Sequence, residues 1–426
     1  MGAWRGVFLG ACVASAPVHA SQPVVRFASY NVAMARSAEG ELATELASPG
    51  SFQAAAIAEV IQIVRPDVLL LNEFDFYAAD PLAAIDGYRT NYLEVGQQGP
   101  LSTTRQSPIT YDYAYVAPTN TGLQPADTTG KVTTPNDPND GVGFEVNFDN
   151  DLAVSPNDPN DAYGFGNFPG QFGFVILSKY EIDVDAIRTF QTFLWEDMPG
   201  NRLPDDSTTP EPQDYYSDQE ESIFRLSSKN HVDVPIVIDG ETVHVIASHP
   251  TPPAFDGPEQ RNVLRNADEI RLIDDYITPG DGDYIYDDEG VTGGLAAGES
   301  FVILGDLNSD PDPDDGDGIK QAIQGLLDDP RVQGLEPTSD FNPSDPDQTA
   351  SFGLRADYAL PSADLEVLET AVFSPTVGEP GGLLVGLSDH RLVYVDVVVP
   401  EPGLSALAVL GVAGLMTRRS SRPALR

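Results

Sequence analysis

Cysteine is almost absent from this chain of 426 residues, which contains one, Cys12. Without a second cysteine, the chain cannot form an internal disulfide. Cys12 lies in an amino-terminal segment that we expect to be removed, so the mature protein would also lack a thiol for catalysis or metal binding. The absence of disulfides does not exclude export, because export does not require them.

Basic residues are also scarce. Lys and Arg number 23 against 66 Asp and Glu, which gives a formal net charge of −43. A surface this acidic favours solubility and repels polyanions at long range. It argues against a protein that grips nucleic acid through its general surface, but not against a local cationic or metal-filled site. Adaptation to high salt or to calcium-rich surroundings would give the same charge balance.

The chain has no apolar run long enough to be a clear membrane span. Its first residues, MGAWRGVFLGACVASAPVHA, contain one Arg, a short apolar stretch and the small-residue ending Val18-His19-Ala20. This order is typical of a secretory signal peptide. We therefore expect signal peptidase to cleave after Ala20, which makes 1–20 a signal peptide and the protein an exported one.

The carboxyl-terminal segment 400–426 has three parts. Pro400-Glu401-Pro402 is followed by an apolar run at 403–416, rich in Gly and Ala, and then by Arg418 and Arg419. One interpretation is a weak anchor with the arginines on the cytoplasmic side. The order also resembles the PEP-CTERM sorting signal of bacterial surface proteins. That resemblance implies transient membrane contact, processing by an exosortase-type enzyme, and delivery to the cell envelope, surface or extracellular matrix.

Between the two ends, patterns typical of strands alternate with patterns typical of helices, and a hydrophobic fraction of 41% is enough for a large core. A two-residue Asp239-Gly240 loop predicts a hairpin with a type I′ turn. Mixed strands with intervening helices indicate a layered α/β domain. Strands are predicted within 24–34, 67–75, 111–118, 172–182, 234–250, 301–304, 350–360 and 390–399, and helices within 51–66, 258–277 and 318–328.

Two acidic segments interrupt this pattern. The first, 119–161, is rich in Asn, Asp, Pro and Gly and contains the hexapeptide PNDPND twice, whereas the second, 203–221, is polar with many acids. We interpret both as surface insertions rather than as linkers between domains. Their acid density suits Ca²⁺, but the spacing matches no EF-hand loop, so a solvated loop is favoured.

Polar residues of types that bind metal or transfer protons follow or close many of the apolar runs. Alone, each is explained by a cap or a turn, and the pair Asp306 and Asn308 in ILGDLNSD suits a turn well. In an extended segment, however, these two residues share one face at the carboxyl end of a strand. The full set is Asn31, Glu73, His249, Asp306, Asn308, Asp357, Asp389 and His390.

The order of these residues (N, E, H, GDLN, D-Y and then S-D-H) resembles the endonuclease/exonuclease/phosphatase superfamily, which includes deoxyribonuclease I-like nucleases, bacterial sphingomyelinases and inositol-polyphosphate phosphatases. The resemblance spans about 24–399, and GDLN and the terminal SDH are its most specific parts. It implies a four-layered α/β sandwich with two packed, mostly antiparallel sheets. It also implies metal-dependent hydrolysis of phosphoesters.

The resemblance also implies individual roles. Glu73 is the expected principal ligand of Mg²⁺, or of Mn²⁺ or Ca²⁺, with Asn31 nearby and Asp389 contributing. Asp306 orients or deprotonates the attacking water, and Asn308 hydrogen-bonds the phosphate. The other expected catalytic residues are His249 at the phosphate or leaving oxygen, His390 at the phosphate or water, and Asp357, which fixes the tautomer of His390.

The chain departs from the family pattern in two places. No clear counterpart exists for the acidic residue that supports the first His in nuclease members, and a strand that usually ends Leu-Ser-Arg here ends Leu177-Ser178-Lys179. Arg261 and Arg265 follow His249 on one face of a predicted helix and are candidates for binding the substrate phosphate.

We expect a phosphodiesterase or nuclease that acts on extracellular phosphoesters, with nucleic acid among the candidate substrates. The alternatives are a sphingomyelinase-like lipid phosphodiesterase, for which no obvious exposed aromatic hairpin is visible, and a non-catalytic envelope protein that keeps the fold. The complete set of polar residues argues against the last alternative.

Overall fold

The computed structural model describes residues 22–99, 102–125, 146, 148–149, 159–205, 214–311, 320–339, 342, 346–376, 378–379, 381–382 and 385–400. Both terminal predictions, the signal peptide at 1–20 and the sorting segment at 400–426, therefore lie outside the described residues except for Pro400. In the part of the chain that is described, no helix has the length and apolar character needed to cross a membrane.

Two six-stranded sheets form the centre of the molecule. In the first sheet the strand order is β11-β12-β1-β2-β4-β3, and in the second it is β10-β9-β8-β7-β5, with β6 also paired to β7. Neighbouring strands are antiparallel except for the pairs β1–β2 and β8–β9. The strands are β1 Val24–Met34, β2 Val68–Phe74, β3 Tyr113–Val116, β4 Phe174–Ser178, β5 Glu181–Ile182, β6 Arg188–Thr189, β7 His231–Ile238, β8 Glu241–Ser248, β9 Ser300–Asp306, β10 Asp357–Pro361, β11 Glu366–Phe373 and β12 Leu392–Val398.

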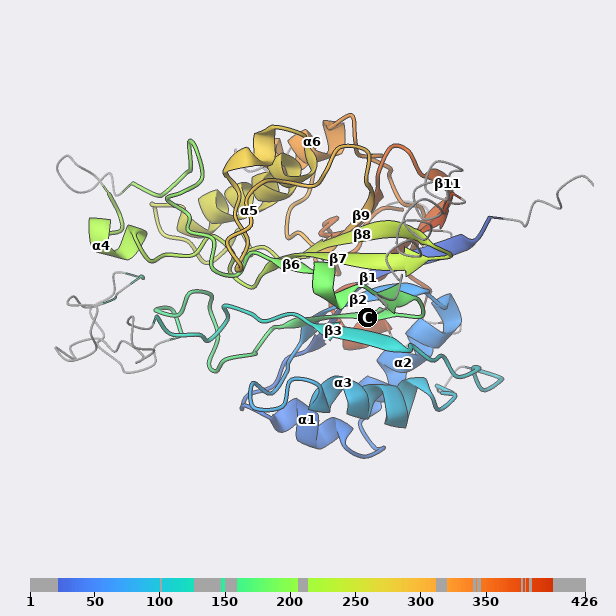
Figure 1. The fold of residues 1–426 in the computed structure, drawn as a ribbon. Helices are drawn as coiled ribbons and strands as arrows, with labels where there is room; N and C mark the ends of the chain where they lie inside the picture. The colour runs from blue at the N-terminus through green and yellow to red at the C-terminus, as the bar shows by residue number, and fades with distance from the viewer. Residues whose placement is uncertain are drawn as a thin grey trace, which may run out of the picture.

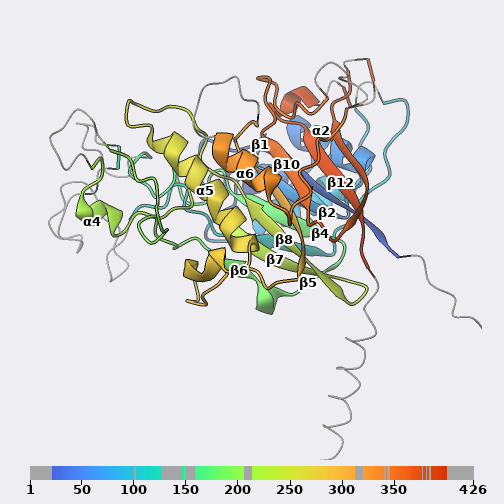
Figure 2. The ribbon, with the colours of Figure 1, turned by 90° about the horizontal axis from the view of Figure 1, so that it is seen from above.

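Helices cover the outer face of each sheet, so that the molecule has four layers (Figure 1). Helices α1, α2 and α3 lie against the first sheet (Figure 1), and α5 and α6 lie side by side over the second (Figure 2). The predicted four-layered α/β sandwich with mostly antiparallel sheets is confirmed. The helices are α1 Glu41–Leu46, α2 Phe52–Val64, α3 Ala83–Tyr88, α4 Asp218–Glu221, α5 Arg261–Ile277 and α6 Lys320–Asp328.

The central strands are apolar on both faces because they are buried on both faces. In β2, Leu69 and Leu71 pack toward the helices, whereas Leu70 packs between the two sheets. In β9, Ile303 packs beneath α5 and α6 while Leu304 joins the core between the sheets. These continuous apolar runs hold each strand in one register, and therefore fix where its polar end lies.

Local signals set several boundaries as predicted. The side chain of Ser51 caps α2 by accepting a hydrogen bond from the N–H of Ala54, and the helix ends before Pro66, which cannot continue it. Asp239 and Gly240 have φ values of 52° and 95°, which confirms a type I′ hairpin turn. Two strands were not predicted: β6, which has two residues, and β11, whose side chains are mostly exposed or half-buried.

Candidate active site

Strand register brings the polar strand ends together. Residues 248 and 305 are paired in the parallel strands β8 and β9, so His249 and Asp306 leave the sheet side by side. Asp357 opens β10 directly opposite Asp306. In the other sheet, Asn31 of β1 pairs with the residue before Glu73 of β2. The cluster therefore forms where the ends of β1 and β2 in one sheet face those of β8, β9 and β10 in the other.

Asp306 is the centre of this cluster. It is buried, and its Oδ2 accepts a hydrogen bond from Nδ2 of Asn31 at 2.9 Å. The Nε2 atoms of His249 and His390 lie 3.5 Å and 3.6 Å from the same oxygen. Nδ2 of Asn31 also donates to Oε1 of Glu73 at 3.1 Å. Four of the other seven residues singled out at strand ends, namely Asn31, Glu73, His249 and His390, thus lie around the carboxylate of Asp306.

His390 is held by Asp357. Its Nδ1 lies 2.7 Å from Oδ2 of Asp357, so the ring donates from Nδ1 and directs Nε2 toward Asp306. Burial alone would lower the pKa of His390, but the neighbouring carboxylates of Asp357 and Asp306 outweigh it and raise that pKa to about 10. The imidazole is therefore positively charged at neutral pH in the absence of other ligands.

His249 is the opposite case. Burial, together with the positive charges of Lys229 and His390, lowers its pKa well below the ordinary value, so this ring is neutral. Its Nδ1 is buried and has no hydrogen-bond partner among the described residues. This agrees with the sequence, which offers no acidic partner for His249. The site thus pairs one neutral and one charged histidine on either side of Asp306.

The carboxylates of Asp306 and Glu73 are strongly desolvated. Burial raises the pKa of Asp306 to about 6, with Asp357 adding to the shift and His390 opposing it. Burial also raises the pKa of Glu73, while the hydrogen bond from Asn31 opposes that shift. A positive charge between the two carboxylates would stabilise their ionised forms.

Backbone conformation at the site is unusual. Glu73 and Asn308 both have positive φ values, 54° and 53°, which residues other than glycine seldom adopt. Asn308 is anchored there by a hydrogen bond from its Nδ2 to the carbonyl oxygen of Pro250 at 3.2 Å. Gly305 precedes Asp306 because strands approach closely there: a Cβ at this position would lie 2.4 Å from the carbonyl oxygen of Ser248.

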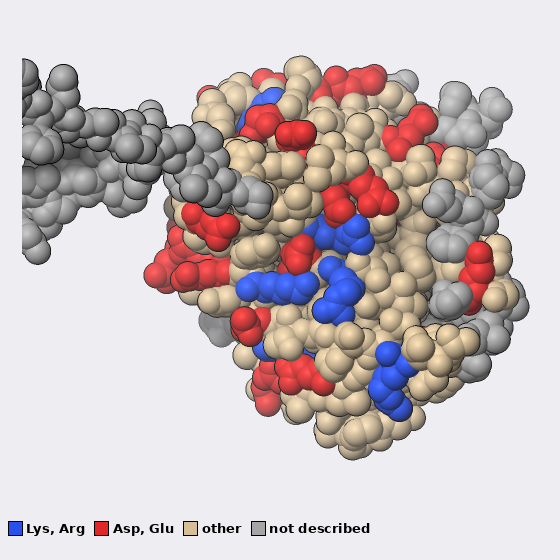
Figure 3. All heavy atoms as spheres, turned by 90° about the vertical axis from the view of Figure 1, so that its right-hand side faces the viewer, with Lys and Arg blue, Asp and Glu red and all other residues tan. Residues whose placement is uncertain are grey.

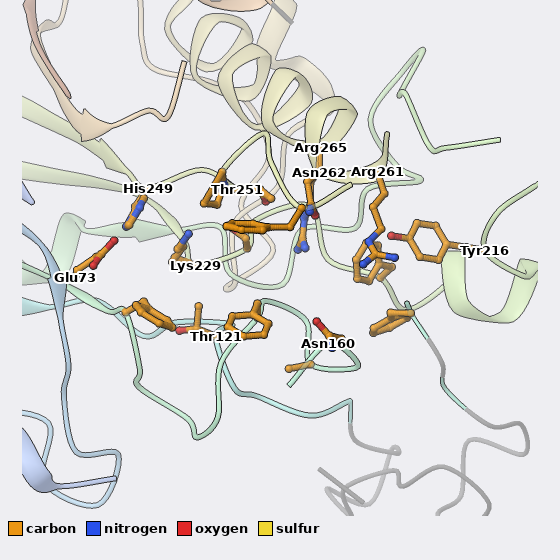
Figure 4. Close-up of a pocket in the computed structure, with 18 residues that line it drawn as sticks. Glu73, Thr121, Asn160, Tyr216, Lys229, His249, Thr251, Arg261, Asn262 and Arg265 are labelled. Atoms are coloured by element: carbon orange, nitrogen blue, oxygen red, sulfur yellow. The ribbon is translucent and has the colours of Figure 1, made fainter. Parts of the chain in front are cut away.

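Three predicted residues lie outside the cluster around Asp306. Asp389 is exposed and is not part of the described groups of potential metal ligands. Arg261 and Arg265 project from the start of α5 into a pocket that begins at Glu73 and His249 (Figure 4). Arg265 is buried and donates to the carbonyl oxygens of Leu226, Tyr163 and Arg225.

Sequence reasoning missed Lys229 and Glu269. Lys229 is buried beside Glu73 and His249, and its Nζ donates to the carbonyl oxygen of Pro250 at 3.3 Å. Burial lowers its pKa, and the carboxylates of Glu269, Glu73 and Asp306 oppose that shift. Glu269 accepts hydrogen bonds from the backbone N–H groups of Ser228 and Thr251, both at 2.6 Å, and so fixes the segments that carry Lys229 and His249. The only available signal was an acid on the apolar face of α5.

The donor set suits a hard divalent cation. Ligand atoms of Glu73, His249 and Asp306 lie within 4.8 Å of one another, and so do those of Asp306, Asp357 and His390. Oxygen donors from carboxylates, with few protein ligands, are what Mg²⁺ and Mn²⁺ prefer. The desolvated pair Glu73 and Asp306 fits such an ion because a dication would supply the missing charge.

Comparison with known proteins gives one family. Residues 28–390 match the model of the Endonuclease/Exonuclease/phosphatase family. Among solved structures, the chain is similar to an endonuclease/exonuclease/phosphatase from Beutenbergia cavernae, with 16% identity and a TM-score of 0.46 over 88% of this chain and 72% of that one. It is similar to sphingomyelinase C from Streptomyces griseocarneus, with 16% identity and a TM-score of 0.39 over 88% and 99%. It is similar to the human Nocturnin catalytic domain with bound sulfate anion, with 14% identity and a TM-score of 0.40 over 88% and 94%. No curated protein matches the chain.

Proposed function

Because the chain belongs to the endonuclease/exonuclease/phosphatase family, we propose that it is a divalent-metal-dependent phosphodiesterase. The observation that carries this proposal is the buried carboxylate of Asp306, which has Asn31, His249 and His390 around one oxygen. Such an arrangement of a carboxylate, a neutral imidazole and a charged imidazole suits hydrolysis of a phosphoester by water.

Glu73 is the residue that we propose holds Mg²⁺, with Asn31 beside it and the carboxylate of Asp306 close by. A divalent ion bound there would offset negative charge on the phosphate oxygens during hydrolysis. Asp389 stays in this proposal as a contributor only through water, since its side chain is exposed. Mn²⁺ or Ca²⁺ would satisfy the same oxygen donors.

The chain's own groups divide the remaining work. Asp306, whose pKa is raised to about 6, orients the attacking water and accepts its proton. His390, charged and fixed by Asp357, donates from Nε2 to a phosphate oxygen. His249 and Asn308 assist at the leaving oxygen and at the phosphate. Lys229 adds a buried positive charge on the pocket side of the cluster.

Removal of metal tests this proposal. We expect EDTA to abolish hydrolysis of bis-p-nitrophenyl phosphate by the purified protein, and Mg²⁺ or Mn²⁺ to restore it. The reason is that a phosphate anion can bind beside two desolvated carboxylates only if a cation offsets their negative charge. The same assay with DNA, RNA, sphingomyelin and phosphomonoesters ranks the substrates. Full activity in a thoroughly metal-stripped sample would contradict the metal requirement.

We also propose that the protein is exported and sorted to the cell envelope or extracellular matrix. This rests on the sequence alone, namely on the signal-like segment ending at Ala20 and on the order of Pro400-Glu401-Pro402, apolar run and arginines. Signal peptidase and an exosortase-type enzyme are the processing partners in this proposal.

A further inference from the structure

A pocket of about 520 Å³ extends from the catalytic cluster away from the sheets. Glu73, His249 and Lys229 lie at one end, and Arg261 and Asn160 lie at the other (Figure 4). A volume of this size is typical of sites for small molecules rather than for polymers. A substrate whose phosphate sits at the cluster would therefore place the rest of its structure in this pocket.

The walls of the pocket are largely aromatic. The rings come from separate parts of the chain, including both acidic insertions, which supply Phe148 and Tyr216. Phe148 packs on Phe224 with ring centroids 4.3 Å apart, and Tyr216 packs on Phe224 at 4.8 Å. The aromatic residues that line the pocket are Phe148, Phe165, Phe172, Tyr216, Phe224 and Phe255.

Two of these rings are largely exposed to solvent, so burial within the protein contributes little to holding them in place. Phe255 is 90% exposed and Phe165 is 56% exposed. Phe255 also has a φ of 64°, a conformation that is unfavourable for a side chain of this kind. Packing within the protein does not account for an exposed aromatic residue in a strained position, whereas contact with a ligand would.

Polar side chains lie between the rings. Asn160, Asn262 and Thr121 line the pocket together with Arg261. Arg261 donates from Nη1 to the hydroxyl of Tyr215, and Asn262 donates from Nδ2 to the carbonyl oxygen of Ala254, but the guanidinium has further donors and the Asn262 amide has an oxygen that can accept. An alkyl chain would cover these groups without bonding to them. A flat heteroaromatic ring matches the site better, because its faces stack on the aromatic rings and its edges bond to amides and a guanidinium.

We propose that this pocket binds a single heteroaromatic ring attached to the scissile phosphate, so that the substrate is a phosphoester of nucleotide size. The proposal rests on the proposed phosphodiesterase function and narrows it to phosphoesters that carry such a ring. Lys229, which lies at the cluster end of the pocket, supplies positive charge beside the phosphate of such a substrate.

Three esters with the same leaving group test the proposal. They are the p-nitrophenyl esters of thymidine monophosphate, of methyl phosphate and of octyl phosphate, and release of p-nitrophenolate reports hydrolysis of each by the full chain. Stacking of one base on aromatic side chains contributes about 1–3 kcal/mol, so we expect kcat/KM for the thymidine ester to exceed that for the methyl ester by about tenfold or more.

Variants at the rim of the pocket test whether its aromatic side chains cause the preference for the thymidine ester. Phe165→Ala and Phe255→Ala should each lower the thymidine-to-methyl ratio of kcat/KM by about threefold or more, since both rings are exposed and their loss leaves the core intact. Phe52→Ala is the matched control, because this ring is also exposed, at 62%, but belongs to α2 on the other side of the first sheet. The control should leave the ratio unchanged.

The remaining outcomes overturn the ring pocket, the phosphodiesterase function or both. Equal kcat/KM for the thymidine and methyl esters, or a ratio that neither rim variant changes, contradicts the ring pocket while leaving the phosphodiesterase intact. A preference for the octyl ester that Phe255→Ala abolishes makes the occupant an alkyl chain instead. If no ester is hydrolysed, calorimetry with thymidine monophosphate decides: binding weakened by Phe255→Ala supports the pocket and removes the proposed function, and no binding removes both.

Discussion

Asp306 uses its two carboxylate oxygens for different purposes. Oδ1 accepts a hydrogen bond from the N–H of Asn308 at 3.0 Å, which shapes the turn after β9. Oδ2 faces Asn31 and the two histidines. The turn and the candidate catalytic site are therefore not competing interpretations of this pair of residues. The same side chain forms the turn and, through that turn, holds its second oxygen in the cluster.

Substitution of Asp306 tests its proposed role. We expect Asp306→Asn to lower turnover of bis-p-nitrophenyl phosphate by about a hundredfold or more, because the amide keeps the size of the side chain but neither accepts a proton nor carries charge. His249→Ala and His390→Ala should have effects of similar size. Initial rates measure the loss, and circular dichroism checks the fold.

Asp364→Asn is the control for this series. Asp364 is exposed and accepts a hydrogen bond from Ser300 at the opposite end of β9, so its amide variant should keep wild-type turnover. Retained activity in a folded Asp306→Asn protein would mean that the GDLN turn is only structural here.

Residues at strand ends could be identified from the sequence, because an apolar run followed by an acid, amide or imidazole leaves a local pattern. Lys229 leaves no such pattern, and Glu269 leaves only an acid on the apolar face of α5, since their positions in the site depend on how α5 packs over the second sheet. His231, by contrast, is a buried histidine that lies outside the cluster, with its ring nitrogens bonded to Ser227 Oγ and to the carbonyl oxygen of Glu269.

At the level of elements, burial on both faces decided what could be predicted. Strands such as β2 and β9 are continuous apolar runs, and their predicted positions are confirmed. Strand β11 lies at the edge of its sheet and alternates weakly, so its sequence carries little signal. The walls of the aromatic pocket were also unpredictable, because they combine insertions that are distant in the chain and acidic overall.

The carboxyl end of α5 contains acids at an unfavourable place. Burial, with nearby Asp329 and Asp275 adding, raises the pKa of Asp274 to about 6. An acid whose pKa is raised on folding stabilises the protein below its unfolded pKa, and this contribution is lost as the pH rises through the folded pKa. The helix dipole also disfavours a carboxylate at this end. Asp274 therefore destabilises the fold at neutral pH.

Asp274→Asn should raise the melting temperature by about 2 °C at pH 7 to 8, because the amide resembles the protonated acid. The gain should shrink as the pH falls below about 6 and vanish near pH 4, where wild-type Asp274 is itself neutral. Calorimetry across this range measures the difference. Asp283→Asn, an exposed acid close by, is the control, and an equal gain in that variant would point to general charge reduction.

For the whole molecule, the two ends of the chain give a prediction that the fold does not address. If the tail is a sorting signal, processing removes the apolar run, whereas a permanent anchor keeps it. We expect mass spectrometry of the native protein to find a mature form that starts near Ser21 and ends close to Pro402. The apolar run is short and rich in Gly, and so holds a membrane poorly, which favours processing. Intact Arg426 in a membrane fraction would indicate an anchored enzyme instead.

The overall charge of the molecule bears on its substrate. The net charge of −43 creates a field that repels polyanions before they reach the site. On the face shown in Figure 3, Lys and Arg side chains form a small group near the centre, with Asp and Glu side chains around it. A nucleic acid approaching this face would meet both signs of charge rather than a continuous basic surface.

Salt should therefore accelerate hydrolysis of a polyanion. Between about 0.01 M and about 0.1 M salt the Debye length falls from about 30 Å to about 10 Å, which screens the long-range repulsion from the acidic surface. We expect kcat/KM for a single-stranded oligonucleotide to rise severalfold over this range at saturating metal. The value for methyl p-nitrophenyl phosphate, which carries one charge, should change little. A protein that grips nucleic acid through phosphate contacts shows the opposite trend, because salt weakens those contacts. A fall in kcat/KM for the oligonucleotide would thus indicate that a local basic surface binds it despite the acidic net charge of the molecule.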